Sequence, residues 1–353
     1  METSMFDYII IGGGSAGCVL AARLSENPAT RVCLLEAGPV DKSVLIHCPA
    51  GLALLAKNGQ ANWAFETVPQ PGLNGRRGYQ PRGKVLGGSS SINAMIYSRG
   101  HPSDYDYWAA QGNPGWSFDE VLPYFRRSEH NERGADAWHG AGGPLNVADL
   151  RSPNRFGPVF VRAGREAGFA VNHDFNGAEQ EGVGMYQVTH KNGERFSAAK
   201  AYLTPNLSRP NLQVITGAHT TRILTEGRRA VGVEYRRGGQ LEQIKATREV
   251  LLCAGSLQSP QLLLLSGIGP GAQLQQHGIA TVHDLPGVGE NLHDHVDVVQ
   301  VVDAPHLKDL FGISPVGLLR VLNCIFEWRR HRRGMLTTNF AEAGGFIKSQ
   351  PGE

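Results

Sequence analysis

A glycine-rich turn near the N-terminus constrains the fold of this chain more than any other feature. An apolar segment leads into the sequence GGGSAG at residues 12–17, a helix-compatible stretch follows, and a second apolar segment ends at Glu36. Gly12 permits a tight turn, Gly14 lets the backbone approach a pyrophosphate, and Gly17 allows the helix to pack closely on the strand. The N-terminus of that helix offers free N–H groups to phosphate oxygens. The pattern therefore predicts a β-α-β unit that binds a dinucleotide.

The acidic residue Glu36 strengthens this interpretation. It lies 19 residues after Gly17, where a carboxylate can accept hydrogen bonds from ribose hydroxyls. Its charge would repel a 2′-phosphate, so the pattern favours a ligand without one. A glycine-rich turn in an ordinary α/β protein is the alternative, and an acid at this spacing argues against it.

The composition is that of a globular protein with more than one domain. At 353 residues the chain can bury a large core, and its 45 glycines indicate many tight turns. A net charge of +2 gives no reason to expect a nucleic-acid partner. The cysteines include no C-x-x-C pair, which favours a reducing compartment. Because there is no apolar run of about 18 residues and no room for a signal peptide before the first strand, we expect a cytoplasmic protein.

Periodicity and turn residues predict alternating strands and helices. Ser117, with Glu120 three residues later, is an N-cap candidate for a short helix. Later apolar segments, one of which ends in a small-residue turn, indicate further strands of a doubly wound sheet. The predicted helices lie at 15–26, 117–130, 197–209 and around 262–265. The predicted strands lie at 6–11, 32–36, 211–215, 230–235 and 248–255, and the segments 37–100 and 131–160 are expected to be irregular.

The segment 316–333 combines an apolar helical face with a basic end at 329–333. Such a helix can rest on an anionic membrane as a peripheral contact. It can also pack against the core, with its basic end solvated and matched to the helix dipole. We favour the core-packing helix because no long amphipathic repeat supports membrane contact.

Four segments further along the chain resemble signatures of the glucose–methanol–choline (GMC) oxidoreductase family. They are Asn62-Trp63 with Thr67–Pro71, RGKVLGGSSSIN at 82–93, GSLQSPQLLLLSGIG at 255–269 and GVGENLHDH at 287–295. Because they follow the glycine-rich turn in the family's order and spacing, essentially the whole chain resembles this family, and most of all its choline dehydrogenase and alcohol dehydrogenase branch. The resemblance implies an α/β fold with a Rossmann-like FAD-binding domain and a discontinuous α+β substrate-binding domain.

The resemblance also implies how the chain divides into domains. Residues 1–99 would form the first part of the FAD-binding domain, and residues 210–299 its second part. Residues 100–209 would form the first part of the substrate-binding or cap region. Residues 300–353 would begin the rest of the substrate-binding domain, which is truncated.

FAD is the cofactor that the resemblance implies. The residues that would hold its ADP half are Gly12, Gly14, Ser15, Ala16, Glu36 and Ala37. Those that would approach its pyrophosphate and flavin ring are Arg82, Val85, Gly87, Gly88, Ser89, Asn93, Ala94 and Met95, and Trp63 also belongs to the implied cofactor site. Thr220 would contact the adenine through its backbone, while Ala254 and Gly255 would form a second turn against the nucleotide. Ile92 occupies the position at which some family members attach the flavin to a histidine, so we expect non-covalent FAD.

The family's chemistry implies oxidation of an alcohol, of the choline or primary-alcohol type, to the aldehyde. A base takes the alcohol proton, hydride passes from the carbinol carbon to flavin N5, and the electrons go on to a quinone-like acceptor. The family's catalytic histidine lies beyond Glu353, so no catalytic residue is named and the chain resembles a fragment. An oxygen-reducing alcohol oxidase and a non-catalytic flavin-binding fragment stay open as alternatives. An NAD enzyme is disfavoured, because an NAD site needs no second glycine-serine run.

The histidines within the chain offer no better catalytic candidate. His293 and His295 flank Asp294, but no distant third ligand is identifiable, so we expect no metal site. His101 and His139 fall in predicted loops and are interpreted as surface or substrate-domain residues.

Overall fold

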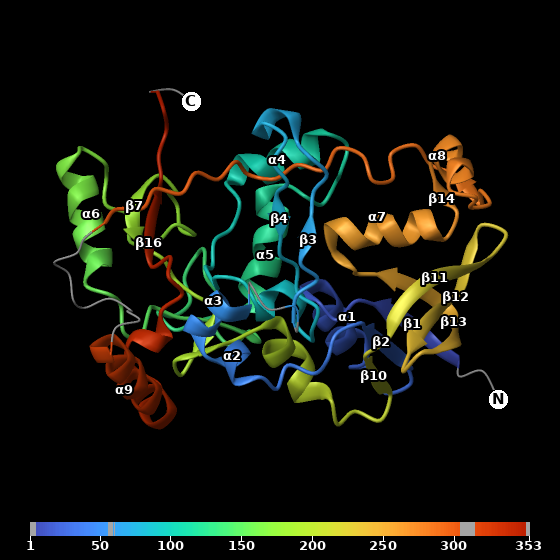
Figure 1. Ribbon diagram of the computed structural model, residues 1–353, viewed down its shortest axis with the longest axis horizontal. Helices are drawn as coiled ribbons and strands as arrows, with labels where there is room; N and C mark the ends of the chain where they lie inside the picture. Colours follow the sequence, from blue (N-terminus) through green and yellow to red (C-terminus); the bar gives the residue numbers. More distant parts are fainter. Residues whose placement is uncertain (1–4, 56–58, 60, 304–314, 351–353) are drawn as a thin grey trace. The chain divides into compact units, whose positions relative to one another are not determined.

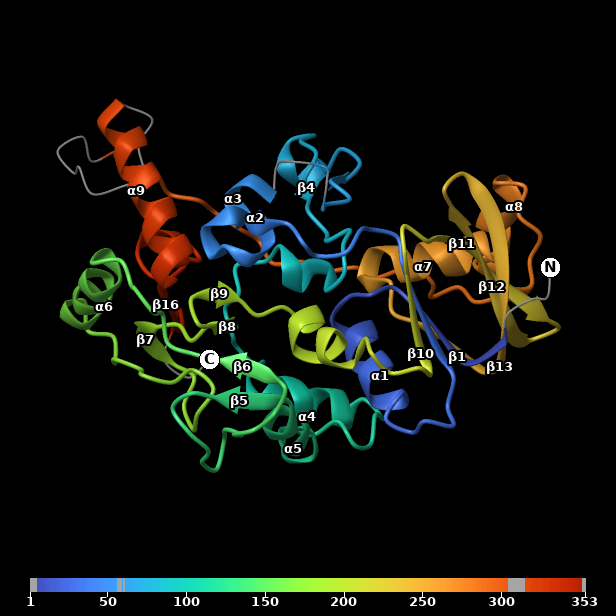
Figure 2. The same cartoon turned by 90° about the horizontal axis from the view of Figure 1, so that it is seen from below.

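The computed structural model describes residues 5–55, 59, 61–303 and 315–350. The chain forms two compact units, each assembled from several stretches of sequence (Figure 1 and Figure 2). The first unit comprises residues 1–40, 84–88 and 206–323, and the second comprises residues 41–83, 89–205 and 324–353. The predicted domains are defined by the ligand that each would bind, and their boundaries stay a prediction.

The first unit is built on a six-stranded sheet (Figure 1). The strand order is β10-β2-β1-β13-β12-β11, with parallel pairing from β10 to β13 and antiparallel pairing from β13 to β11. The bounds are β1 Met5–Ile11, β2 Val32–Glu36, β10 Leu212–Thr216, β11 His219–Glu226, β12 Arg229–Arg237 and β13 Gln240–Leu252. Every residue of β2 is buried, as a central parallel strand requires.

Two helices of the first unit follow parallel strands directly. Helix α1, Ser15–Leu24, comes after β1 and packs against β1 and β2. Helix α7, Gly255–Leu265, comes after β13 and packs on β11. Ile11 at the end of β1 is in register with Leu35 and with Leu252, so the turns that follow β1, β2 and β13 meet at one edge of the sheet. The remaining elements are β14 Ile268–Gly269, α8 Gly271–Gln276 and β15 His283–Asp284.

The second unit contains short helices and small two-stranded sheets. Its helices are α2 Val44–His47, α3 Leu52–Leu55, α4 Pro102–Ala110, α5 Phe118–Ser128 and α6 Phe156–Glu166. Its strand pairs are β3 Phe65–Glu66 with β4 Tyr79–Gln80, β5 Glu129–Asn131 with β6 Leu145–Val147, β7 Gly182–Met185 with β16 Ala343–Phe346, and β8 His190–Lys191 with β9 Glu194–Arg195. Tyr105 of α4 packs its ring against Phe118 and Phe125 of α5. Helix α9, Pro315–His331, contains the boundary between the two units.

The α/β fold class is confirmed by the mostly parallel sheet. The predicted short helix is α5, and the backbone N–H of Ser117 donates to Glu120 Oε2 at 3.1 Å, as a capping box requires. The helix predicted at 197–209 is instead a π-helix, Ala199–Leu203, followed by a 3₁₀ turn, Thr204–Asn206. Strand β13 begins well before the predicted 248–255, because its polar first half pairs with β12. The sequence interpretation missed several elements, among them β11, α4, β6 and α6, and the segment 37–100, expected to be irregular, contains the short elements α2, α3, β3 and β4.

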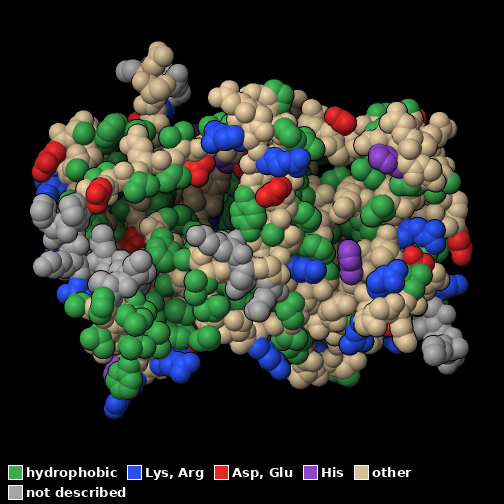
Figure 3. All heavy atoms as spheres, in the orientation of Figure 1, with side chains coloured by type: hydrophobic (Ala, Val, Ile, Leu, Met, Phe, Trp, Pro, Cys, Tyr) green, Lys and Arg blue, Asp and Glu red, His purple; other side chains and the backbone are tan. Residues whose placement is uncertain are grey.

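Helix α9 corrects the interpretation of 316–333 as a core-packing helix. Its apolar side chains are largely exposed, with exposed fractions from 53% to 64% for Val316, Leu318, Leu319, Leu322 and Phe326. Figure 3 shows hydrophobic side chains gathered over this helix. Trp328, by contrast, is buried, and its Nε1 donates to the carbonyl oxygen of Gly193 at 2.9 Å. No helix in the described part of the chain combines the length and the apolar character needed to cross a bilayer.

Candidate cofactor-binding site

The predicted site residues are divided between the two units. The first unit contains Gly12, Gly14, Ser15, Ala16, Glu36, Ala37, Val85, Gly87, Gly88, Thr220, Ala254 and Gly255. The second contains Trp63, Arg82, Ser89, Asn93, Ala94 and Met95.

The turn after β1 requires glycine at two positions. Gly12 has φ +99°, and a Cβ there would lie 2.5 Å from the carbonyl oxygen of Cys253. A Cβ at Gly17 would lie 1.9 Å from the carbonyl oxygen of Gly12. The backbone N–H of Gly12 donates to Leu35 at 2.8 Å, which ties the turn to the end of β2. A side chain at Gly12 or Gly17 would push the turn, the helix and the strands apart.

Helix α1 presents its N-terminus without a side-chain cap. Its N-cap residue is Gly14, and its first turn contains no acidic side chain. Ser15 and Ala16, the first two helical residues, are exposed. Backbone N–H groups in a first helical turn have no intrahelical acceptor, so they and the helix dipole favour an anion at this point.

A second glycine pair packs directly on the first. The N–H of Gly87 donates to the carbonyl oxygen of Gly13 at 2.7 Å. Gly88 has φ +53°, and a Cβ there would lie 2.7 Å from Cα of Gly14. The structure thus joins two predicted cofactor segments, far apart in the sequence, into one backbone surface without side chains. This is the close approach that a bound pyrophosphate needs.

Glu36 has a structural role that the sequence interpretation missed. It is buried, and its Oε2 accepts a hydrogen bond from the N–H of Gly13 at 2.8 Å. Its Oε1 accepts a hydrogen bond from the N–H of Gly38 at 2.7 Å. Burial raises the pKa of Glu36, while the hydrogen bonds from Gly38 and Gly13 oppose that rise. Each carboxylate oxygen keeps a further lone pair, so the same group can also accept from ribose hydroxyls.

The turn after β13 lies beside the glycine turn. The N–H of Cys253 donates to the carbonyl oxygen of Ile11 at 2.8 Å, and Ala254 is the N-cap of α7. Gly255 has φ +81°, which favours glycine. Thr220 lies in β11, and its buried Oγ1 has no hydrogen-bond partner in the described structure.

In the second unit, hydrogen bonds hold Trp63 and Arg82 together. The N–H of Trp63 donates to the carbonyl oxygen of Arg82 at 2.8 Å, and the N–H of Arg82 donates to Asn62 Oδ1 at 2.9 Å. Asn93 is exposed, and its Oδ1 accepts from the N–H of Met95 at 3.1 Å. Met95 has φ +59°, an unusual conformation for a residue with a side chain.

Two buried residues that contact the segment 90–95, Arg195 and His190, were not predicted to belong to the site. Arg195 donates to backbone oxygens of residues Ser90 and Asn93. His190 Nε2 lies 3.1 Å from Met95 Sδ, and burial lowers the pKa of His190 to about 3. His190 therefore stays neutral at physiological pH and is a weak base.

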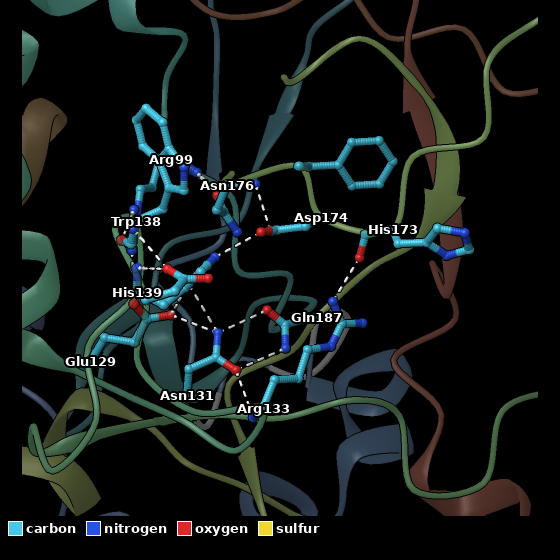
Figure 4. A network of polar contacts seen from close by, with 12 residues as sticks. Arg99, Glu129, Asn131, Arg133, Trp138, His139, His173, Asp174, Asn176 and Gln187 are labelled. Carbon is cyan, nitrogen blue, oxygen red and sulfur yellow. Dashed lines mark hydrogen bonds and ion pairs between the residues drawn. The ribbon is translucent and has the colours of Figure 1, made fainter. Parts of the chain in front are cut away.

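His139 lies in a buried polar network (Figure 4). Its Nε2 is 2.8 Å from Asp174 Oδ2, and its Nδ1 is 3.0 Å from Glu129 Oε1. Arg99 Nη2 donates to Glu129 Oε2 at 2.8 Å, while Asn131 donates to Glu129 Oε1 at 3.0 Å. Hydrogen bonds to Asp174 and Glu129 raise the pKa of His139 to about 9, so the ring is a fixed cation at neutral pH and not a free base. The surface location considered for His139 is wrong.

The other predicted histidines lie on the surface. His101 is exposed and accepts from the N–H of Ser103 at the start of α4. His293 and His295 are also exposed, and no group of three His, Cys, Asp or Glu side chains suited to a metal occurs among the residues described. The expectation of no metal site stays a prediction.

Comparison with known proteins gives consistent matches. The family described as GMC oxidoreductase matches residues 6–297. The alcohol dehydrogenase [acceptor] of Pseudomonas putida is 51% identical over 98% of this chain and 63% of its own length. The oxygen-dependent choline dehydrogenase of Brucella anthropi is 45% identical over 98% of this chain and 62% of its own length. The chain therefore spans less than two thirds of the length of these relatives.

Solved structures match over the same region. The pyridoxine 4-oxidase from Mesorbium loti has a TM-score of 0.76 and 38% identity, covering 80% of this chain and 55% of its own. A formate oxidase variant from Aspergillus oryzae RIB40, studied for FAD modification, has a TM-score of 0.85 and 30% identity, covering 98% of this chain and 62% of its own.

Proposed function

Because this chain belongs to the GMC oxidoreductase family and has the fold of its FAD-binding members, we propose that it binds FAD non-covalently as part of an alcohol-oxidising enzyme. The alcohol would be choline or a primary alcohol, and the electrons would pass to a quinone-like acceptor. The Pseudomonas relative is an alcohol dehydrogenase and the Brucella relative a choline dehydrogenase, which supports alcohol oxidation.

The close packing of Gly88 on Gly14 is the observation that carries the proposal. A Cβ at Gly88 would be only 2.7 Å from Gly14 Cα, so the two glycine segments form one bare backbone surface beside the uncapped start of α1. That surface suits a pyrophosphate, since N–H groups and the helix dipole both favour phosphate oxygens.

The neighbouring side chains fit the rest of the ADP half. Glu36 stands at the end of β2 with free lone pairs for ribose hydroxyls, and its negative charge disfavours a 2′-phosphate. The buried Thr220 hydroxyl has no hydrogen-bond partner among the described residues and has hydrogen-bonding capacity left for a polar ligand. The residues that we propose to hold FAD in the first unit are Gly12, Gly14, Ser15, Ala16, Glu36, Ala37, Val85, Gly87, Gly88, Thr220, Ala254 and Gly255.

Trp63, Arg82, Ser89, Asn93, Ala94 and Met95 of the second unit complete the proposed set. Chain continuity supports this assignment, because Ser89 directly follows Gly88 of the glycine surface. Bound FAD supplies the two-electron acceptor for the carbinol carbon, and the protein supplies orientation and electrostatics. Neither His139, held as a cation, nor His190, whose pKa is depressed, suits the base that takes the alcohol proton, so we assign no catalytic residue.

The test is the visible spectrum of the purified chain, with and without added FAD, followed by anaerobic addition of choline and simple primary alcohols. Bound flavin that bleaches would support alcohol oxidation by this chain. Bound flavin that persists with every alcohol would favour the alternative, a flavin-binding fragment without catalytic activity. If no flavin binds, the proposal fails. Oxygen consumption during turnover separates an oxidase from a dehydrogenase.

We also propose a cytoplasmic location and no nucleic-acid partner. In the described structure no disulfide joins Cys18, Cys33, Cys48, Cys253 or Cys324, which suits a reducing compartment. The net charge of +2 provides no strong field for a polyanion. Fractionation of the cells that make the protein tests the location.

A further inference from the structure

Arg195 is a fully buried cation. Its exposed fraction is 0%, and no carboxylate forms an ion pair with it among the residues that the structure describes. The Nη2 atom is buried and donates no hydrogen bond to any residue that the structure describes. Burial lowers the pKa of Arg195 to about 9, which still leaves it charged near neutral pH. A buried charge that is neither paired nor fully hydrogen-bonded is costly, so its presence calls for an explanation.

The guanidinium clamps one short segment of the second unit. Nη1 donates to the carbonyl oxygen of Ser90 at 3.1 Å, to that of Asn93 at 2.8 Å and to Asn93 Oδ1 at 2.9 Å. Nε donates to the carbonyl oxygen of Ile46 at 2.9 Å. A single side chain thereby fixes both ends of the turn 90–93.

The clamp extends to Met95 through Asn93. The same Asn93 Oδ1 that accepts from Arg195 accepts from the N–H of Met95, whose φ is +59°. Asn93 itself is exposed, while Arg195 behind it is not. Within segment 90–95, the exposed Asn93 therefore separates solvent from the buried guanidinium of Arg195, while Ser91, Ile92 and Met95 are buried.

We propose that Arg195 is a positioning residue for the flavin, which holds segment 90–95 in shape and places a positive charge behind it that favours the reduced, anionic flavin. This inference rests on the proposed FAD binding, since the segment is the one expected to approach the flavin ring. A charge acts strongly through a layer from which water is excluded. Charge near a flavin ring tunes its reduction potential.

Two variants of the FAD-loaded chain distinguish the clamp on segment 90–95 from the effect of the positive charge. R195K keeps the charge and loses most of the clamp, whereas R195M removes both. R209M is the matched control, because Arg209 also donates to a backbone oxygen and a hydroxyl, at Ala22 and Ser25 of the first unit. We measure the dissociation constant of FAD by fluorescence, the midpoint potential by equilibration with a reference dye, and amide hydrogen exchange of 90–95 by mass spectrometry.

We expect R195M to lose at least tenfold in the preference for reduced over oxidised flavin, which is a fall of about 30 mV for a two-electron couple. R195K should retain the potential but bind FAD roughly tenfold more weakly and exchange faster at 90–95. R209M should leave the potential and the exchange of that segment unchanged. An unchanged potential in folded, FAD-bound R195M would overturn the electrostatic role. Unchanged exchange at 90–95 in both variants would overturn the clamp. Hydrogen exchange tests the clamp even if the wild-type chain binds no FAD. Failure of the wild-type chain to bind FAD would overturn the proposed function instead.

Discussion

The Nε2 atom of His139 lies 2.8 Å from Asp174 Oδ2, while the opposite ring nitrogen faces the buried carboxylate of Glu129 at 3.0 Å. Both ring nitrogens can donate only when the imidazole is protonated. The two contacts therefore favour the protonated imidazolium, and for this reason the pKa of His139 is raised to about 9. Arg99 supplies the second cation beside Glu129, so the network contains two carboxylates and two cations.

This network should make the stability of the chain depend on pH. The pKa of His139 is about 9 in the folded chain and about 6.5 when unfolded, so the protonated ring stabilises the fold fully below about pH 6.5. That contribution is lost as the pH rises through 9. We expect the difference in the free energy of unfolding in urea between wild type and H139Q to fall by about 3 kcal/mol between pH 6 and pH 9.5. A difference independent of pH across this window would show that folding does not shift the pKa of His139.

The backbone surface formed by Gly14 and Gly88 predicts that two alanine variants differ in FAD affinity. Gly88 and Gly217 both have positive φ, +53° and +67°, but only a Cβ at Gly88 meets backbone, because nothing lies within 4 Å of one at Gly217. Both variants should lose about 1–2 kcal/mol of stability from the left-handed conformation. G88A should also bind FAD at least tenfold more weakly, since the new methyl displaces Gly14 and the start of α1. Equal FAD affinities of the two folded variants in a fluorescence titration would contradict the proposed pyrophosphate surface.

How much of this site is predictable from sequence depends on how far apart along the chain the contacting residues lie. Gly12, Gly14 and Glu36 were placed correctly at the ends of β1 and β2, because a strand, a turn and a helix follow local rules. The clamp by Arg195 was not predictable, since 102 residues separate it from Asn93 and no pattern marks the pair. His139 was missed for the same reason. Its loop is polar and rich in glycine, and only the fold brings Asp174 to it.

Glu36 should be sensitive to the loss of a single oxygen. Both carboxylate oxygens accept backbone N–H groups, from Gly13 and from Gly38, so the amide of E36Q would leave one buried donor facing another. We expect E36Q to lose about 1–3 kcal/mol in urea unfolding and to bind FAD more weakly. Glu26, whose carboxylate pairs with Arg23 on the surface, provides the control: E26Q should change stability by less than about 1 kcal/mol. Equal losses in the two variants would argue against the bridging role of Glu36.

The apolar residue Ile92 predicts that denaturation releases the flavin from the protein. The side chain is apolar and buried, and its N–H donates to the carbonyl oxygen of Ser89, so this position offers no nucleophilic nitrogen to a flavin. Acid precipitation of the FAD-loaded chain should therefore release all of the flavin into the supernatant, where it is measured by absorbance. The control is the same chain denatured in guanidinium and passed through a desalting column, which removes non-covalent flavin without acid chemistry. Flavin that stays with the precipitate and with the desalted chain would mean that another side chain forms the bond, and the non-covalent proposal would fail even though FAD binding stood.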